Sequence, residues 1–299
     1  MRTFARCQMI GERFGSFKAV ARLGEGGIGE VFLAEHQHIE RRVAIKVLIR
    51  QLTQDPDTVR RFFTEARAIS LIRHPGIVEV YDCDVHRNGR AYIVMEFLEG
   101  ETLGKRLDRE DSLPWSYACH LVSLVADAIG AAHEKGIIHR DLKPENVFLL
   151  AGQRSPPPVE LKVLDFGLAK LLGGDSAGGR ATAAGSVIGS PTYMSPEQCN
   201  GGPVDSRSDV YSLGCMLFEM VAGNPPFGGA RVRDLLVAHR FQAPPPLTAF
   251  GSSVPTWLGR LVARMLSKDP AGRPQTMREI VGVLAGPSAP RSVARSTAM

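Results

Sequence analysis

The sequence lacks the marks of several large protein classes. Its five cysteines are scattered, with no C-x-x-C pair and no histidine at metal-ligand spacing, so we expect neither a disulfide framework nor a zinc site. No run approaches the roughly 18 apolar residues of a membrane span, and the first fifteen residues have no uninterrupted apolar core of a signal peptide. We therefore expect a cytoplasmic chain without a membrane span.

Charge of one sign is not concentrated anywhere in the chain. The 36 basic and 31 acidic residues are interleaved, and the net charge of +5 forms no basic stripe. This pattern favours a solvated basic surface over a nucleic-acid partner, so we expect no nucleic acid to bind. With 44% hydrophobic residues over 299 positions, the chain can form one large domain or two lobes around a cleft.

The first hundred residues have mostly strand-like patterns. A single helical segment interrupts them, starting at Asp55-Pro56-Asp57 and stopped by His74-Pro75. The strand-like runs, which are short and either β-branched or alternating, are 17–23, 30–35, 42–48, 77–81 and 91–97. We expect a small, mostly antiparallel sheet with one helix.

After Gly100 the hydrophobic period becomes helical. Two strand-like runs, 147–150 and 161–164, are separated by a proline-rich loop. The expected helices lie at about 114–136, 205–222, 230–240, 255–267 and 276–285. The stretch 173–189 has almost no apolar periodicity and is expected to be mobile.

The expected fold class is therefore α+β, with a small antiparallel β lobe and a larger, mainly helical lobe. The predicted divisions are an N-terminal extension at 1–14, a domain at 15–285 with lobes at about 15–97 and 101–285, and a disordered tail at 286–299.

A glycine-rich turn lies between the first two long strand-like runs. The motif G-x-G-x-x-G occurs in dinucleotide-binding folds and in other nucleotide-binding turns, and it can also be an ordinary turn. Here the run 30–34 continues as a strand and not as a helix, which favours a hairpin. Backbone N–H groups can approach polyphosphate where Cβ atoms are missing. The predicted nucleotide lid comprises Leu23, Gly24, Glu25, Gly26, Gly27, Ile28, Gly29, Glu30 and Val31.

Lys46 is a charged residue in an otherwise apolar strand, and such a lysine usually faces solvent. It follows the glycine turn by one hairpin, and Glu65 lies on the inner part of the one helix in this half. We expect an ion pair between the two, which would hold Lys46 against the phosphates of a nucleotide and make the helix position a switch.

The most specific motif is His139-Arg140-Asp141-Leu142-Lys143-Pro144-Glu145-Asn146, followed by Asp165-Phe166-Gly167. Phosphoryl transfer needs a base for the acceptor hydroxyl, a cation over the developing charge, and oxygen ligands for magnesium. Asp141 is the expected base and Lys143 the cation. Asn146 and Asp165 are the expected metal ligands.

On these motifs the chain resembles eukaryotic-like (Hanks-type) serine/threonine protein kinases, and its glycine-rich turn is similar to bacterial members. The resemblance runs from about 15 to 285. It includes Ser195-Pro196-Glu197, where the family often has Ala-Pro-Glu, and the stretches 209–214, 223–227 and 268–274.

The resemblance implies a bilobal protein kinase fold and a signalling enzyme that transfers the γ-phosphate of ATP to serine or threonine hydroxyls of proteins. Mg²⁺ is the implied metal, with Mn²⁺ as a substitute. Val31, Ala44 and Phe148 would enclose adenine, beside Met95 as gatekeeper, with hydrogen bonds from the backbone of Glu96 and Leu98. Plain core packing is the alternative role for these apolar residues.

The resemblance also implies scaffolding roles. Glu197 would pair with Arg273, and Asp209 would brace the catalytic loop. Lys143 favours serine or threonine acceptors.

Regulation by phosphate is implied too. Arg140 would receive a phosphate from the activation segment, where Thr182, Ser186 and Ser190 are the candidate sites of autophosphorylation, with Thr182 foremost.

Two other functions stay open. A scaffold that binds nucleotide without turnover would have the same fold, but such proteins usually lack the lysine or an aspartate, and Lys46, Asp141 and Asp165 are all present. Phosphorylation of a small molecule is disfavoured by 189–197, which resembles a peptide-binding platform.

Overall fold

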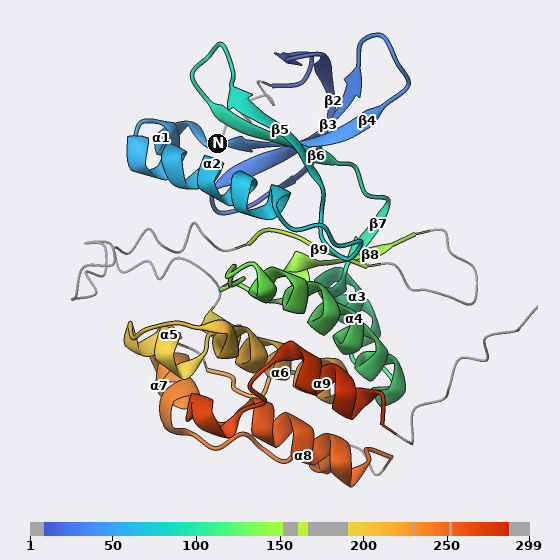
Figure 1. Cartoon of the computed structure of the whole chain (residues 1–299), viewed down its shortest axis with the longest axis vertical. Coiled ribbons are helices and arrows are strands. Elements are labelled where there is room, and N and C mark those ends of the chain that lie inside the picture. The colour runs from blue at the N-terminus through green and yellow to red at the C-terminus, as the bar shows by residue number, and fades with distance from the viewer. Residues whose placement is uncertain (1–8, 152–160, 167–190, 230, 251–252, 287–299) are drawn as a thin grey trace, which may run out of the picture.

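The computed structural model describes residues 9–151, 161–166, 191–229, 231–250 and 253–286, and these form a β-rich lobe stacked on a helical lobe (Figure 1). The expected α+β, bilobal architecture is confirmed. No helix among the described residues is both long enough and apolar enough to cross a membrane.

The N-terminal lobe is a six-stranded sheet in which every pair of neighbours is antiparallel, in the order β1-β2-β3-β4-β6-β5. Its strands are β1 (Arg13–Phe14), β2 (Phe17–Glu25), β3 (Gly29–His36), β4 (Arg42–Leu48), β5 (Val80–Val85) and β6 (Ala91–Glu96). Helix α2 (Pro56–Ser70) packs against β5 and β6, and its N-cap Asp55 accepts a hydrogen bond from Asp57 N.

Two features of this lobe differ from the expectation. A four-residue helix, α1 (Arg50–Thr53), precedes α2, so the lobe has two helices among its described residues. The strand expected at 77–81 is found at β5 instead, and Ile77 makes only an isolated bridge to Val163. Because β5 is a mostly exposed edge strand, it can hold aspartates without burying them in a core. The apolar residues that predicted the strand therefore lie mostly before its start.

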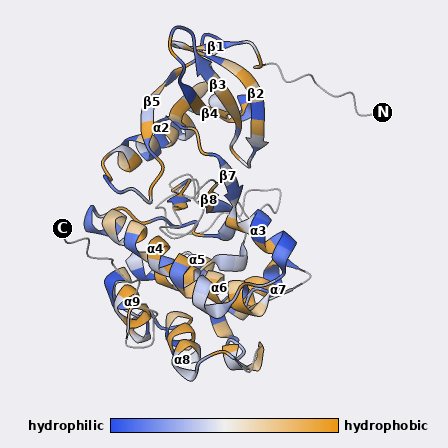
Figure 2. Cartoon of the chain, turned by 90° about the vertical axis from the view of Figure 1, so that its right-hand side faces the viewer, coloured by the Kyte–Doolittle hydropathy of each residue, from blue (hydrophilic) through white to orange (hydrophobic). Residues whose placement is uncertain are grey.

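The C-terminal lobe is mainly helical. Its helices are α3 (Leu103–Glu110), α4 (Trp115–Glu134), α5 (Pro196–Asn200), α6 (Ser206–Ala222), α7 (Val232–Phe241), α8 (Thr256–Met265) and α9 (Met277–Leu284). A three-stranded sheet of β7 (Gly100–Thr102), β8 (Val147–Leu150) and β9 (Leu161–Val163) lies on the side that faces the β lobe (Figure 1). The sequence does not predict α3, which is strongly hydrophilic (Figure 2) and buries only Leu103 and Leu107.

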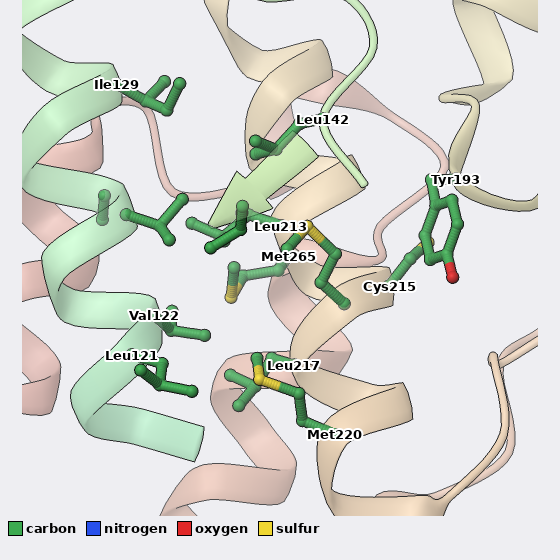
Figure 3. Packing of buried hydrophobic residues seen from close by; sticks show 14 of the residues in the cluster. Leu121, Val122, Ile129, Leu142, Tyr193, Leu213, Cys215, Leu217, Met220 and Met265 are labelled. Carbon is green, nitrogen blue, oxygen red and sulfur yellow. The ribbon is translucent and has the colours of Figure 1, made fainter. Parts of the chain in front are cut away.

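The core of this lobe lies between α4 and α6. Side chains of both helices interdigitate with Met265 of α8, and Leu142 of the catalytic loop reaches the same cluster (Figure 3). Helix α6 is buried on nearly all of its faces, so it forms a rigid support for the segments that pack against it. Gly223 ends α6 in the left-handed region, with φ of 79°.

Candidate active site

The loop 139–146, the catalytic loop, is bound by a buried carboxylate of helix α6. Asp209, in the first turn of α6, accepts hydrogen bonds from the backbone N–H groups of His139 at 2.8 Å and Arg140 at 2.9 Å, and lies 2.7 Å from His133 Nε2. Arg140 has a φ of 64°, a strained conformation for a residue with a side chain. The carboxylate thus fixes the loop in a shape that it would not adopt alone, as expected for a brace.

The histidine of this loop is a packing residue. His139 is fully buried, and burial lowers its pKa, so the ring is neutral. Its Nε2 lies 3.0 Å from the carbonyl oxygen of Leu164, and its ring lies 4.7 Å from that of Phe166. These contacts connect the catalytic loop to the chain around Asp165.

The two expected catalytic side chains, of Asp141 and Lys143, and one expected metal ligand, Asn146, converge within the loop. Lys143 Nζ lies 3.1 Å from Asp141 Oδ2. Asn146 Nδ2 donates to the backbone carbonyl of Asp141 at 2.8 Å. Asp141 is therefore fixed in position by its neighbours, with its carboxylate beside a cation.

Lys46 is paired differently from the expectation. Its Nζ lies 2.7 Å from Asp165 Oδ1, whereas the expected ion pair with Glu65 is not formed among the described residues. Glu65 is 3% exposed, and its Oε2 is buried without a hydrogen-bond partner. Asp165 has a φ of 41° and follows β9, and its carboxylate approaches the ammonium group of Lys46. The ammonium group of Lys46 therefore pairs with Asp165, which lies within bonding distance, and not with Glu65.

The pKa values in this cluster follow from burial and charge. Burial alone would lower the pKa of Lys46, but the negative charges of Asp165, Glu65 and Asp141 outweigh it, so this pKa is raised and the amine stays protonated. Burial raises the pKa of Glu65 to about 7, assisted by the charges of Asp165 and Asp141 and opposed by Lys46. Glu65 therefore changes charge near neutral pH.

A nucleotide-sized cavity of about 480 Å³ lies between the lobes. Val31 and Ala44 line it from the β lobe, and Phe148 lines it from the helical lobe. The other expected base-binding residues, Met95, Glu96 and Leu98, border it as well. Sequence reasoning did not identify Val78, Thr102 and Leu164, which also line this cavity and carry no motif of their own.

The glycine turn covers a second cavity of about 520 Å³. The two cavities share lining residues, among them Val31, Lys46 and Asp165. The second cavity is bordered by residues 24–29 and also by Lys46, Glu65, Asp141, Lys143, Asn146 and Asp165. The structure thus brings the expected phosphate-binding and catalytic residues to one place. A Cβ at Gly29 would lie 2.7 Å from the carbonyl oxygen of Val47, so only glycine fits there.

Glu30 is the exception within the expected lid. Its carboxylate lies 3.0 Å from Arg90 Nη2 and 3.5 Å from Arg22 Nε, and it borders neither cavity. Successive side chains of a strand point to opposite faces, so Glu30 and its neighbour Val31 cannot both face the nucleotide site.

Asn146 and Asp165 fit a magnesium ion. Mg²⁺ takes oxygen ligands, and in nucleotide sites it binds one or two protein side chains together with phosphate oxygens. Because Nδ2 of Asn146 donates to Asp141, its Oδ1 is the atom left to bind a cation. The described residues contain no cluster of three or more histidine, cysteine or acidic side chains that could hold a metal.

A buried ion pair stabilises the chain beneath this site. Arg273 donates from Nη1 and Nη2 to the two carboxylate oxygens of Glu197 at 2.8 and 2.9 Å, which confirms the expected pair. Burial alone would raise the pKa of Glu197, but the bonds from Arg273 and Ser208 lower it overall. Gln198, the next residue, donates to the carbonyl oxygen of Arg140 at 2.8 Å and so ties α5 to the catalytic loop.

The candidate phosphorylation sites Thr182, Ser186 and Ser190 lie outside the described residues, as do the loop 152–160 and the tail from 287. The side chain of Arg140, which would receive a phosphate, is described. Its Nε is buried without a hydrogen-bond partner among the described residues.

Comparisons with known proteins agree with this geometry. The family model for the protein kinase domain matches residues 17–282. The serine/threonine-protein kinase Pkn1 of Myxococcus xanthus is 43% identical over 269 residues, covering 90% of this chain and 38% of Pkn1. PknB of Mycobacterium leprae is 39% identical, over 86% of this chain and 40% of PknB.

A third relative and a solved structure extend the comparison. Pkn3 of Myxococcus xanthus is 37% identical, covering 100% of this chain and 56% of Pkn3, so the chain spans between about a third and just over half of these relatives. The crystal structure of the Mycobacterium tuberculosis PknI kinase domain superposes with a TM-score of 0.70 at 28% identity, over 92% of this chain and 97% of that one. This chain therefore belongs to the protein kinase family, with bacterial serine/threonine-protein kinases as its relatives.

Proposed function

We propose that this chain is an ATP-dependent serine/threonine protein kinase whose catalytic domain occupies about 15–285. The observation that carries the proposal is the convergence of Lys46, Asp141, Lys143, Asn146 and Asp165 on one cavity beneath the glycine turn. Each supplies one group that phosphoryl transfer requires, and no group in the set is missing.

Each residue has one role in the proposed reaction. The purine lies between Val31, Ala44 and Phe148, and the phosphates lie under the backbone N–H groups of the turn. Asp141 accepts the proton of a serine or threonine hydroxyl, because its carboxylate borders the same cavity. Lys143, 3.1 Å from Asp141, stabilises the negative charge of the phosphoryl group as it moves.

The metal and Lys46 act on the phosphates. Mg²⁺, or Mn²⁺ in its place, would neutralise phosphate charge when held by Asp165 and Asn146. Lys46 is protonated and buried next to Asp165, so it can move to phosphate oxygens when a cation takes over that carboxylate. Glu65 is then the nearest partner for its ammonium group.

Phosphorylation of the chain by itself is a second part of the proposal. Arg140 lies next to the catalytic aspartate with a buried Nε that no described residue binds, and a guanidinium group in this situation pairs well with phosphate. Thr182 is the foremost candidate, followed by Ser186 and Ser190. A Thr182→Ala protein with full activity, and no phosphate on that peptide in the unmutated protein, would refute this part.

The decisive experiment is transfer of radiolabelled γ-phosphate to a generic basic protein and to the chain itself. We expect transfer by the unmutated protein and none by Asp141→Asn or Lys46→Met. Lys18→Met, which alters an exposed lysine of strand β2 in the same sheet, is the matched control and should be active. If the unmutated protein binds ATP without turnover, the scaffold alternative is correct, and if Lys46→Met turns over normally, the assigned roles are wrong.

A further inference from the structure

A partly buried ion pair lies where the two lobes meet, behind the nucleotide cavity. Lys162 in β9 and Glu96 at the end of β6 are 2.7 Å apart, from Nζ to Oε1, and their side chains are only 16% and 17% exposed. The pair joins the small sheet of the helical lobe to the strand that leads into residues 97–99, which connect the lobes and are called here the hinge segment.

The same two side chains hold a third segment, the turn between α2 and β5. Lys162 Nζ donates to the carbonyl oxygen of Ile77 at 3.3 Å. Oε1 of Glu96 accepts the backbone N–H of Glu79 at 2.7 Å, and the backbone N–H of Glu96 donates to the carbonyl oxygen of Glu79 at 2.9 Å. One carboxylate oxygen therefore binds both the ammonium group of β9 and the backbone of the turn.

Both members of the pair are directly connected to the walls of the nucleotide cavity. Glu96 borders the cavity itself. Lys162 is the cross-strand partner of Phe148, whose ring lines the opposite wall. Partners opposite each other in an antiparallel sheet point to the same face, so the stem of Lys162 lies on the side of the sheet that carries Phe148.

We infer that Lys162 is a positioning residue for the purine base: its ammonium group fixes β6 and the hinge segment relative to the wall formed by β8. This inference rests on the proposed binding of ATP. A base that is recognised by backbone groups at 96 and 98 needs those groups at a set distance from Phe148, and the ion pair is the charged contact that sets this distance. Burial makes the pair stronger than an exposed one, because water screens it less.

The hinge segment offers a control of the same chemistry. Arg42 Nη2 lies 2.6 Å from Glu99 Oε1, but these side chains are 51% and 62% exposed. Exposed pairs of this kind contribute little, because solvent screens the attraction and both side chains lose freedom. Loss of Arg42 should therefore leave the base-binding geometry unchanged.

The test compares Lys162→Met with Arg42→Met. Affinity for a fluorescent ATP analogue with Mg²⁺ is measured in an Asp141→Asn background, and KM for ATP and kcat are measured without that change. For Lys162→Met we expect the dissociation constant and KM to rise about tenfold, because the variant leaves a partly buried carboxylate without its cation. We expect kcat to change by less than about twofold, because Lys162 bonds Glu96, which borders the cavity, and makes no such bond to the catalytic loop among the described residues.

Two further variants separate positioning from a general loss of structure. Lys162→Arg keeps the charge and should restore nucleotide affinity, while Glu96→Gln should weaken it, and Lys162→Met should add little to Glu96→Gln because both remove the same pair. The inference is overturned if Lys162→Met binds the analogue as tightly as its parent, if Arg42→Met has an equal effect, or if kcat falls while affinity is kept. If the unmutated chain binds no ATP analogue, the proposed function fails instead.

Discussion

Replacing Asp209 by alanine tests whether the catalytic loop depends on support from α6. The carboxylate is fully buried and is bonded to two backbone N–H groups of the loop, at His139 and Arg140, and to the ring of His133. Alanine removes all three bonds at once and leaves two N–H groups of the loop without an acceptor. It also removes the bond to the backbone N–H of Arg140 that helps to hold this residue at its positive φ, and leaves the bond from Gln198 to its carbonyl oxygen.

The size of the effect follows from these contacts. Hydrogen bonds to a charged group contribute about 1.5–3 kcal/mol each, and a buried donor left without a partner costs about 1–3 kcal/mol. These terms overlap, so we expect the free energy of unfolding to fall by about 3–5 kcal/mol, as for other buried charged networks that lose one member. If Asp141 moves by about 1 Å when the loop relaxes, kcat falls about a hundredfold.

The assay is urea unfolding together with steady-state kinetics, with Asp205→Ala as the matched control. Asp205 is the N-cap of the same helix α6 but is half exposed, so its loss should cost about 1 kcal/mol and leave kcat unchanged. We expect KM for ATP to change little in Asp209→Ala, since Asp209 does not border the nucleotide cavity. A folded Asp209→Ala protein that keeps kcat within about threefold of the unmutated value would refute the support role.

Three other predictions concern charge and close packing. The pKa of Glu65 is raised to about 7 in the folded state, so its ionisation destabilises that state increasingly as pH rises from the unfolded pKa to about 7. Glu65→Gln should therefore resist urea better than the unmutated protein, and by a larger margin at about pH 8 than at about pH 5. An equal margin at both pH values would contradict this prediction. The pKa of Glu197 is lowered in the folded state, so its charge stabilises that state above the unfolded pKa, and this stabilisation is lost as pH falls through the folded pKa. Glu197→Gln should therefore make the free energy of unfolding less dependent on pH in the acid range. Arg273→Ala should lower the free energy of unfolding, measured with urea, by about 3–5 kcal/mol. Gly29→Ala should lower the melting temperature and raise KM for ATP, because its Cβ would lie 2.7 Å from a backbone carbonyl of β4, whereas the matched Gly27→Ala has open space and should leave the melting temperature unchanged.

The chemistry of the site could be predicted from sequence because few residue types can perform it. Asp141, Asn146 and Asp165 occur at a spacing that has little other use, and the structure brings them to one cavity. The ends of α6 were also predictable, since Asp205 caps its start and Gly223 ends it in a left-handed conformation.

Contacts that depend on how the lobes pack could not be predicted. The pairing of Lys46 with Asp165 instead of Glu65 depends on the position of α2 relative to β9, which no local pattern encodes. The ion pair of Lys162 and Glu96 has no sequence signal either, because a lysine in a short strand is ordinary and most such residues face solvent.

The cavity under the glycine turn also has a consequence for what can enter it. Five carboxylates border it, from Glu25, Glu65, Asp141, Glu145 and Asp165, against the two ammonium groups of Lys46 and Lys143. Since Glu65 titrates near neutral pH, the bordering charge lies between −2 and −3. An uncomplexed polyphosphate is repelled by such a surface, while a divalent cation is attracted to it. A cleft with this charge should therefore favour a nucleotide whose phosphate charge is partly neutralised by a divalent cation, and it should disfavour a nucleotide or an inorganic polyphosphate without a cation.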